Sequence, residues 1–480
     1  MISFIISVLV LILGYYTYGK VVERIFGIDT EKETPAIRLR DDIDFMPLPA
    51  WRIFLIQFLN IAGLGPIFGA IAGAMFGPAA FLWIVLGSIF AGAVHDYFSG
   101  MLSVRHDGLS ISEIVGIYLG PQMKHIMRFF TVILLIFVGT VFLMGPAKII
   151  DGMTGNMWNL WIWVGIILAY YMLSTLLPID KMIGKLYPIF GVAMLLMALG
   201  LVIALFFGDY HIPELVPANL VNMTSDPEAT PLFPILFVTI ACGAISGFHA
   251  TQSPLMARCM QNEKLGRKIF FGTMITEGVV ALIWAAAAMT FFGNVGGLND
   301  AMLANGNNAA WAANEISLNM LGKIGGVLAL LGIVAAPITS GDTAFRSARL
   351  ILSDIIKTDQ KQIKNRLYIS IPLFIIAFVL TQIDFGIIWR YFAWSNQTLA
   401  TVVLWTITAY LIYENKLYWI TLIPAIFMTM VCTTYILIAP EGFELENNIA
   451  YIGGTVLTIG FSLLFWYYAV QRKKVYVSLG

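Results

Sequence analysis

Residues 60–70 read NIAGLGPIFGA, and residues 240–250 read IACGAISGFHA. Each segment lies inside an apolar stretch long enough to cross a bilayer. Both contain glycines, and the first also a proline, which an uninterrupted helix disfavours. Backbone that unwinds at membrane depth is tolerated only where it is buried in protein or lines a cavity. A matching pair of interrupted spans predicts a transporter binding site, whereas close helix packing through small residues is the simpler alternative.

The composition places the chain among membrane proteins with many spans. Of its 480 residues, 59% are hydrophobic and only 12% are charged, which excludes an ordinary soluble domain. The formal net charge is zero, so nothing indicates a nucleic-acid partner, and lipid is the expected surrounding. The three cysteines, Cys242, Cys259 and Cys432, have no metal-ligand spacing, so we expect them to pack.

Apolar runs long enough to span the hydrocarbon core number roughly thirteen. The predicted spans are 2–19, 53–77, 79–101, 127–148, 160–178, 184–208, 231–254, 268–293, 318–341, 368–388, 391–413, 417–438 and 450–471. Tight turns are expected near Pro78 and near Arg390. The first run lacks the basic start and the cleavage site of a signal peptide, so it is expected to be a retained helix.

Charge asymmetry orients these spans. If the N-terminus lies outside, almost all of the 28 basic residues fall on the cytoplasmic side, and the outer loops 209–230, 294–317 and 439–449 contain none. The positive-inside rule therefore predicts an external N-terminus and a cytoplasmic C-terminus.

With this orientation the two interrupted spans run in opposite directions, and each begins a set of five. The predicted organisation is a five-plus-five inverted repeat with one helix before it and two after it. Its parts are an N-terminal helix and cytoplasmic loop (1–52), the first repeat (53–208), an extracellular loop (209–230), the second repeat (231–413) and a C-terminal helix pair with a tail (414–480). This all-α layout resembles the leucine-transporter-like fold.

Five strings of the sequence resemble the carbon starvation protein A (CstA) family. They are ACGAISGFH at 241–249, GAVHDYF at 92–98, RHDG at 105–108, TSGDTAFR at 339–346 and FAWSNQ at 392–397. The resemblance runs from about residue 2 to residue 438. It implies a transporter of the cytoplasmic membrane for peptides, or in some members for pyruvate, coupled to an ion gradient.

Polar and small residues at the two interruptions are the candidate substrate ligands. Their hydroxyl, imidazole and amide groups, together with free backbone groups, could bind a peptide or a carboxylate. Hydrogen bonding between helices is the alternative for each of them. The candidates are Asn60, Gly63, Gly65, Ser246, Gly247, His249 and Gln252.

Ala336, Thr339 and Ser340 fall on one helical face at i, i+3 and i+4. In sodium-coupled members of the leucine-transporter-like fold, the eighth core helix supplies a carbonyl and two hydroxyls in this pattern, and hard cations prefer oxygen ligands. The pattern predicts a sodium site against the break of the first core helix. No other cofactor is expected, and proton coupling remains the competing interpretation.

A carboxylate within a membrane span costs free energy, so its presence there indicates a function by default. Glu277, well inside its span, is the leading candidate for proton coupling or for a buried partner interaction. Asp342 is a further candidate for coupling or gating, with a helix-end ion pair to Arg346 as the simpler account. His95 and Asp96 are predicted either to form a gate with Arg105 or Arg346, or to cap a helix at the interface.

These patterns predict a secondary active transporter that imports peptides by alternating access, coupled to sodium or protons, with pyruvate or another small carboxylate as the alternative substrate. A channel is disfavoured because no periodic polar stripe runs through several spans. An enzyme is disfavoured because the sequence has no HExxH motif or similar cluster. The oligomeric state is left open.

Overall fold

A computed structural model describes residues 1–42, 44–155, 158–176, 179–360 and 362–479, and all regular structure in these ranges is helical. The first half contains α1 (Ile2–Tyr16), α2 (Tyr18–Phe26), α3 (Pro35–Arg38), α4 (Ala50–Ala62), η1 (Gly65–Gly69), α5 (Ala70–Ala74), α6 (Ala79–Leu86), η2 (Gly87–Gly92), α7 (Ala93–Arg105), α8 (Ile111–Leu119), α9 (Pro121–Met153), α10 (Leu160–Leu176), α11 (Ile179–Phe207) and η3 (Pro217–Asn219). The second half contains α12 (Leu232–Thr239), α13 (Gly247–Ala257), η4 (Glu263–Leu265), η5 (Arg267–Phe271), α14 (Gly272–Phe291), α15 (Val295–Ala304), α16 (Ala309–Ala329), η6 (Leu330–Val334), α17 (Ala335–Ile356), α18 (Ile363–Leu380), α19 (Phe385–Tyr413), α20 (Trp419–Ile438) and α21 (Asn447–Leu479).

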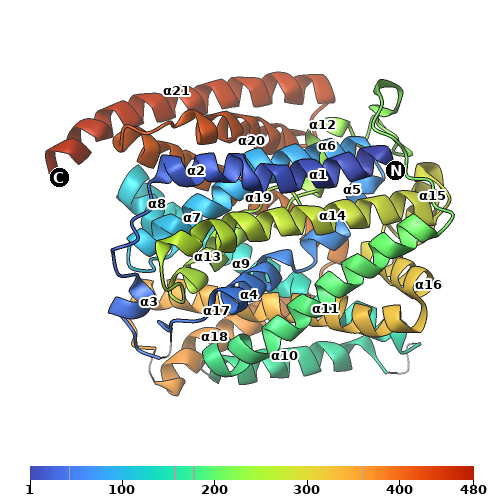
Figure 1. Ribbon diagram of the computed structural model, residues 1–480, viewed down its shortest axis with the longest axis horizontal. Helices are drawn as coiled ribbons and strands as arrows, with labels where there is room; N and C mark the ends of the chain where they lie inside the picture. The colour runs from blue at the N-terminus through green and yellow to red at the C-terminus, as the bar shows by residue number, and fades with distance from the viewer. Residues whose placement is uncertain (43, 156–157, 177–178, 361, 480) are drawn as a thin grey trace.

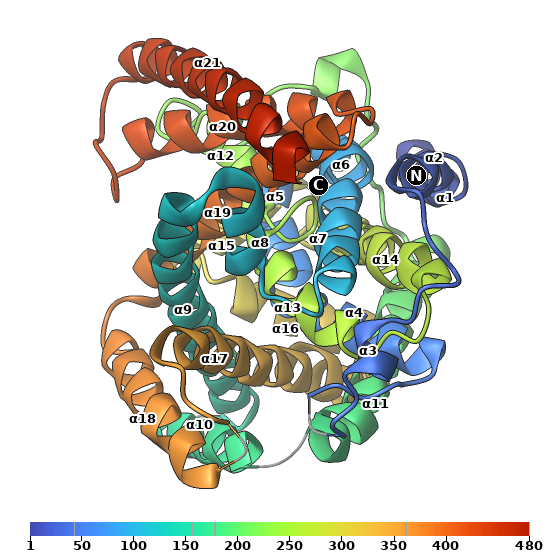
Figure 2. The ribbon, with the colours of Figure 1, turned by 90° about the vertical axis from the view of Figure 1, so that its left-hand side faces the viewer.

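The long helices form one bundle whose two chain ends lie at opposite ends (Figure 1). Viewed from one end, α7 and α13 lie towards the middle, α1 and α2 lie at one edge, and α20 and α21 cover another side (Figure 2). The short helices α3 and α8 lie at the C-terminal end of the bundle, and α15 lies at the N-terminal end (Figure 1). This arrangement agrees with the two sides that the charge pattern predicts.

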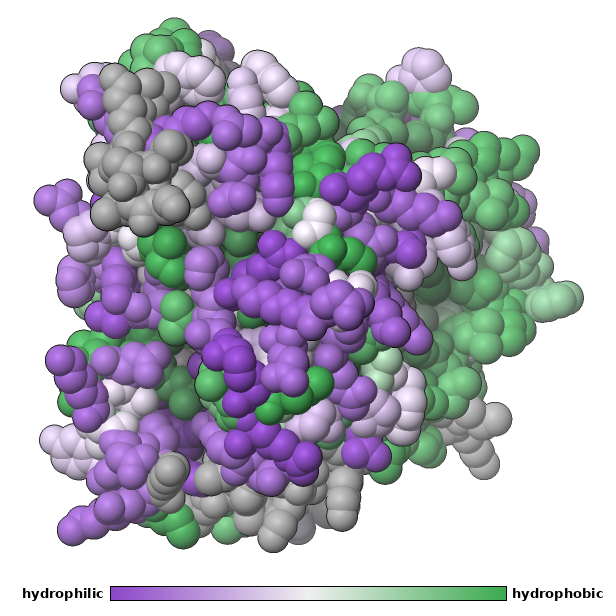
Figure 3. All heavy atoms as spheres, turned by 60° about the vertical axis from the view of Figure 1, so that its left-hand side comes forward, coloured by the Kyte–Doolittle hydropathy of each residue, from purple (hydrophilic) through white to green (hydrophobic). Residues whose placement is uncertain are grey.

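The surface divides into a polar end and an apolar flank. The end that carries the C-terminus is covered largely by hydrophilic residues, and hydrophobic residues cover the adjoining flank (Figure 3). Within the described residues, nine helices are long and apolar enough to cross a membrane, or ten if the bent pair around Gly63 is one span. A polytopic membrane protein is therefore confirmed, whereas the thirteen spans and the inverted repeat remain predictions.

Both predicted interruptions are present. The axis turns by 53° between α4 and the helical segment Gly65–Ala74, at Gly63 and Leu64. In the second half, residues 240–246 separate α12 from α13, and Ser246 is extended just before α13 begins. Glycine and proline weaken helices at these points, which is why composition alone located them.

Two predicted boundaries were wrong. Arg390 lies inside α19, and the turn instead precedes Asp384, whose carboxylate caps α19 by accepting from the backbone N–H groups of Gly386 and Ile387 at 2.9 and 3.2 Å. The span predicted to end at residue 341 continues as α17 to Ile356. Its charged residues 342–349 are buried by neighbouring helices, so their polarity does not end the helix.

Candidate functional site

The two interruptions lie directly against each other. A Cβ atom placed on Gly65 would be 2.2 Å from the Cβ of Cys242, so only glycine allows this approach. A Cβ atom on Gly69 would likewise lie 2.9 Å from the carbonyl oxygen of Thr239, at the end of α12. The glycines of the first break therefore bring backbone from both halves of the chain into contact in the interior.

Side chains of neighbouring helices hold the unwound segment 240–246. The indole of Trp83 donates to the carbonyl of Ile240 at 3.0 Å, and the hydroxyl of Ser88 donates to the carbonyl of Gly243 at 3.0 Å. Asn396 of α19 accepts from the backbone N–H of Phe248 at 2.7 Å. These bonds replace the helical hydrogen bonds that the interruption removes.

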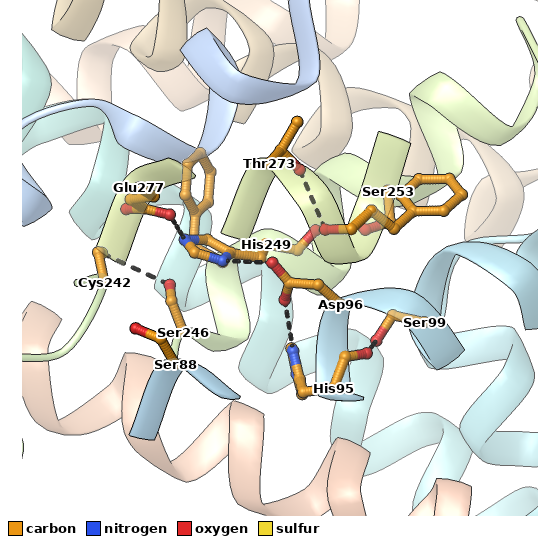
Figure 4. Close-up of polar contacts among 12 residues, drawn as sticks. Ser88, His95, Asp96, Ser99, Cys242, Ser246, His249, Ser253, Thr273 and Glu277 are labelled. Atoms are coloured by element: carbon orange, nitrogen blue, oxygen red, sulfur yellow. Dashed lines mark hydrogen bonds and ion pairs between the residues drawn. The ribbon is translucent and has the colours of Figure 1, made fainter. Parts of the chain in front are cut away.

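Four ionisable side chains form a continuous buried chain beside the second break (Figure 4). One oxygen of Asp96 lies 2.8 Å from Nδ1 of His95, and the other lies 2.9 Å from Nδ1 of His249. Nε2 of His249 lies 3.4 Å from the carboxylate of Glu277. All four side chains are fully buried, and they come from α7, α13 and α14.

This chain corrects the predicted roles of its members. His95 and Asp96 do not cap a helix at an interface, because neither is exposed. Arg105, a predicted gate partner, instead pairs with Glu263 at 2.7 Å. Glu277 does have the buried partner that was predicted, namely His249. The sequence could not join these residues, because their contact depends on how α7, α13 and α14 cross.

Buried amides near the two interruptions lack hydrogen bonds within the described residues. Both polar atoms of Gln57 and both of Asn60 are unpaired, as is Oε1 of Gln252. All three side chains are fully buried, and Gln57 and Asn60 share a face of α4 at i and i+3. A buried polar atom without a partner costs about 1–3 kcal/mol, so a ligand is a physical reason to keep it. Gln57 was missed, although its spacing from Asn60 could have identified it.

Helix α17 lies against the break of α4, as the sodium hypothesis requires. The hydroxyl of Ser340 donates to the carbonyl of Leu59 at 3.0 Å and to that of Ala336 at 3.1 Å. Thr339 donates to the carbonyl of Ala336 at 2.6 Å. The predicted oxygen atoms are therefore together, while the ion itself remains a prediction.

Asp342 lies in the interior of α17, so its interpretation as a helix-end residue was wrong. Its carboxylate accepts from Ser174 at 2.6 Å and from Tyr187 at 2.8 Å, and it is 2% exposed. Arg346 donates to the carbonyl of Ser174 at 3.3 Å. Asp342 therefore links α17 to α10 and α11.

The remaining candidates at the breaks fill packing positions. Gly247 lies against α19, because an added Cβ would be 2.5 Å from the carbonyl oxygen of Asn396. Gly63 lies against the ring of Phe142. The hydroxyl of Ser246 donates to Asn396 at 3.1 Å.

Comparison with known proteins first identifies a shared fold. The chain shares its fold with a solved mutant of the manganese transporter of Eremococcus coleocola, with a TM-score of 0.52 and 13% identity over 92% of this chain and 99% of the transporter. The family model "Carbon starvation protein CstA" matches residues 1–199, 151–386 and 318–435. The chain therefore belongs to the CstA family.

Three relatives show how similar this chain is to other proteins of known sequence. An uncharacterized membrane protein of Haemophilus influenzae is 42% identical over 63% of this chain and 95% of its own length. The peptide transporter CstA of Bacillus subtilis is 26% identical over 83% of each chain. The pyruvate/proton symporter BtsT of Escherichia coli is 25% identical over 59% of this chain and 48% of the symporter.

Proposed function

We propose that this chain is a secondary active transporter that imports peptides across the cytoplasmic membrane by alternating access. The observation that carries the proposal is the contact between two interrupted helices in the interior, at Gly65 and Cys242. In transporters, paired interrupted helices place the substrate site near the bilayer midplane. Family membership and the names of the relatives support a transport role.

The unpaired amides favour a peptide as substrate. Gln57 and Asn60 each offer a donor and an acceptor, and a peptide group needs both. Pyruvate or another small carboxylate is the second candidate, because the N-terminus of α13 at Gly247 carries a partial positive charge that favours an anion. The proton symporter among the relatives supports this alternative.

Two groups of residues support two different coupling ions. The oxygens of Ala336, Thr339 and Ser340 beside the break of α4 support sodium. The buried chain from His95 to Glu277 supports protons, because adjacent ionisable groups within a membrane protein form proton relays. In either case, 53–208 and 231–413 would act as the inverted repeats of a leucine-transporter-like core, with the N-terminus outside.

The deciding experiment uses purified protein in liposomes. We expect accumulation of a labelled dipeptide only when a pH or sodium gradient is imposed, and we expect unlabelled dipeptide to compete better than pyruvate. Pyruvate accumulation without dipeptide competition would select the carboxylate alternative. Gradient-independent flux of either compound would exclude a secondary active transporter.

The ion is identified by changing one gradient at a time. For sodium, Thr339→Ala with Ser340→Ala removes two oxygen ligands and should abolish sodium dependence. For protons, Glu277→Gln should remove the response to a pH gradient. Thr398→Ala is the control, because this hydroxyl donates to the carbonyl of Trp394 in its own helix at 2.9 Å and belongs to neither group of residues.

A further inference from the structure

A thiol, an imidazole and a carboxylate lie close together in the buried site beside the second break. Ligand atoms of Cys242, His249 and Glu277 all lie within 4.8 Å of one another, and the three residues are buried. Cys242 lies in the unwound segment, His249 lies on α13 and Glu277 lies on α14 (Figure 4). The thiol was expected only to pack, since six residues separate it from the histidine and no metal motif has this spacing.

The orientation of His249 is that of a metal ligand. Its Nδ1 is bound to Asp96 at 2.9 Å, so the proton of a neutral ring lies on Nδ1 and the lone pair lies on Nε2. A carboxylate on the far nitrogen of a ligating histidine is the usual second-shell arrangement of metal sites. Asp96 is itself held by His95 at 2.8 Å.

Nε2 of His249 and the carboxylate of Glu277 are two acceptors that face each other. They lie 3.4 Å apart, and neither Nε2 nor either oxygen of Glu277 makes a hydrogen bond within the described residues. Two fully buried acceptors in this position need a cation or a proton between them. Ligands of one tetrahedral zinc ion lie about 3.4 Å apart, given bond lengths of roughly 2.0–2.2 Å.

A proton would satisfy His249 and Glu277 without the sulfur beside them. Sγ of Cys242 makes two long contacts, donating to the hydroxyl of Ser246 at 3.5 Å and accepting from the amide of Asn396 at 3.7 Å, and it still lies within reach of an ion held by His249 and Glu277. Sγ of Cys242 is a soft ligand, and a set of thiolate, imidazole and carboxylate selects zinc-like ions over magnesium or calcium. We propose that Cys242, His249 and Glu277 bind one late divalent transition-metal ion of the zinc class. The bound ion ties the segment 240–246 to α14.

Zinc binding to the purified chain tests this directly, without any measurement of transport. After a chelator wash, titration calorimetry and elemental analysis should show one tightly bound Zn²⁺ per chain, and Mg²⁺ should not compete. Cys242→Ser and Glu277→Gln should each weaken binding at least tenfold. Cys432→Ser is the matched control, because this buried cysteine lies far along the chain on α20, and its zinc affinity should stay native.

Cobalt gives a second measurement for variants that bind weakly. Co²⁺ in the native site should show the visible absorption of a tetrahedral ion and a sulfur-to-cobalt charge-transfer band near the ultraviolet. The charge-transfer band should vanish in Cys242→Ser or, if that variant does not fold, in Cys242→Ala. The absence of stoichiometric Zn²⁺ binding by the folded native protein, or an intact band after removal of Cys242, would overturn the proposal. Dipeptide uptake in the presence of chelator tests the transport function separately.

Discussion

Asp96 uses both carboxylate oxygens to hold two histidines from different helices. An amide at this position keeps one acceptor oxygen and turns the other into a donor, so one ring N–H loses its partner. We expect Asp96→Asn to lower the free energy of unfolding by about 1–3 kcal/mol and to abolish uptake. Thermal unfolding in detergent and liposome uptake measure the two effects.

Ser99→Ala is the control for Asp96→Asn, because its hydroxyl only donates to the carbonyl of His95 in its own helix, at 2.6 Å. Near-native stability and uptake are expected for it. Native behaviour of Asp96→Asn would mean that the histidine contacts carry neither stability nor transport.

The unpaired amide of Asn60 allows folding and function to be separated. Leucine has a similar size and removes two polar atoms that the fold leaves without partners. We therefore expect Asn60→Leu to unfold at the native temperature or above it, whereas uptake falls about tenfold through the loss of a substrate hydrogen bond. Asn305→Leu, at an exposed position beyond α15, should leave uptake unchanged. Lower stability of Asn60→Leu with full uptake would assign Asn60 to the fold.

Sequence reasoning identified His249, Glu277 and Asn60 one at a time, because buried polar residue types are rare in spans. It did not join His249 to Asp96 or to Cys242. Those partners are more than a hundred residues apart or lack a recognisable spacing, and only the crossing of the helices brings them together. Exposure was misjudged for His95 for the same reason: hydropathy does not report which neighbours cover a helix end.

At the scale of elements, the contact between the two interruptions depends on a missing side chain. Gly65→Ala would place a Cβ 2.2 Å from the Cβ of Cys242, so the two segments must separate. We expect a loss of about 1–3 kcal/mol in the free energy of unfolding. Adding Cys242→Gly removes the clashing atoms and should restore part of this loss.

A double-mutant cycle of these two positions, followed by thermal unfolding, measures their coupling. Gly152→Ala in α9 is the matched control, because nothing lies within 4 Å of its Cβ position. Additive effects of Gly65→Ala and Cys242→Gly would show that the segments do not touch.

Glu214 of the loop after α11 caps the N-terminus of α1. The ammonium group of Met1 and the hydroxyl and backbone N–H of Ser3 donate to its carboxylate, which lowers the pKa of Glu214 to about 2 from its ordinary value of 4.5. Because the folded-state pKa is lower, the stabilisation is present above about pH 4.5 and is lost as the pH falls towards 2. The Tm of Glu214→Gln should therefore be lower than that of the native protein at pH 7. This difference in Tm should shrink in acid.

Glu228→Gln, an exposed acid in the same loop, provides the comparison and should show no such difference. A constant gap between the native protein and Glu214→Gln across the pH range would mean that the carboxylate charge does not stabilise α1.

The interruptions themselves could be predicted because glycine and proline act locally on helices. The start of α19 could also have been found, since an aspartate before an apolar run is a helix N-cap signal. Arg390 was instead treated as a boundary because of its charge. Its guanidinium pairs with Glu441, which lies beyond α20, at 3.1 Å, so a charge near a helix end does not end the helix.

For the whole molecule, the charge pattern predicts which end faces outwards. The three native cysteines are buried, so single cysteines introduced at exposed positions can report the side. A membrane-impermeant maleimide added to intact cells should label Asn305→Cys, beyond α15, and should label Glu31→Cys only after the membrane is opened. The reverse pattern would invert the predicted topology.

Helix α21 contains 33 residues and extends past the neighbouring helices at the C-terminal end of the bundle (Figure 1). At 1.5 Å per residue it is roughly 50 Å long, whereas the hydrocarbon layer is about 30 Å thick. A helix of this length must tilt or carry its last turns into the headgroup layer. Arg472 and Lys473 lie in that part of the helix, where anionic phospholipids attract basic side chains. The thickness and charge of the host bilayer thereby set the angle at which α21 meets the bundle.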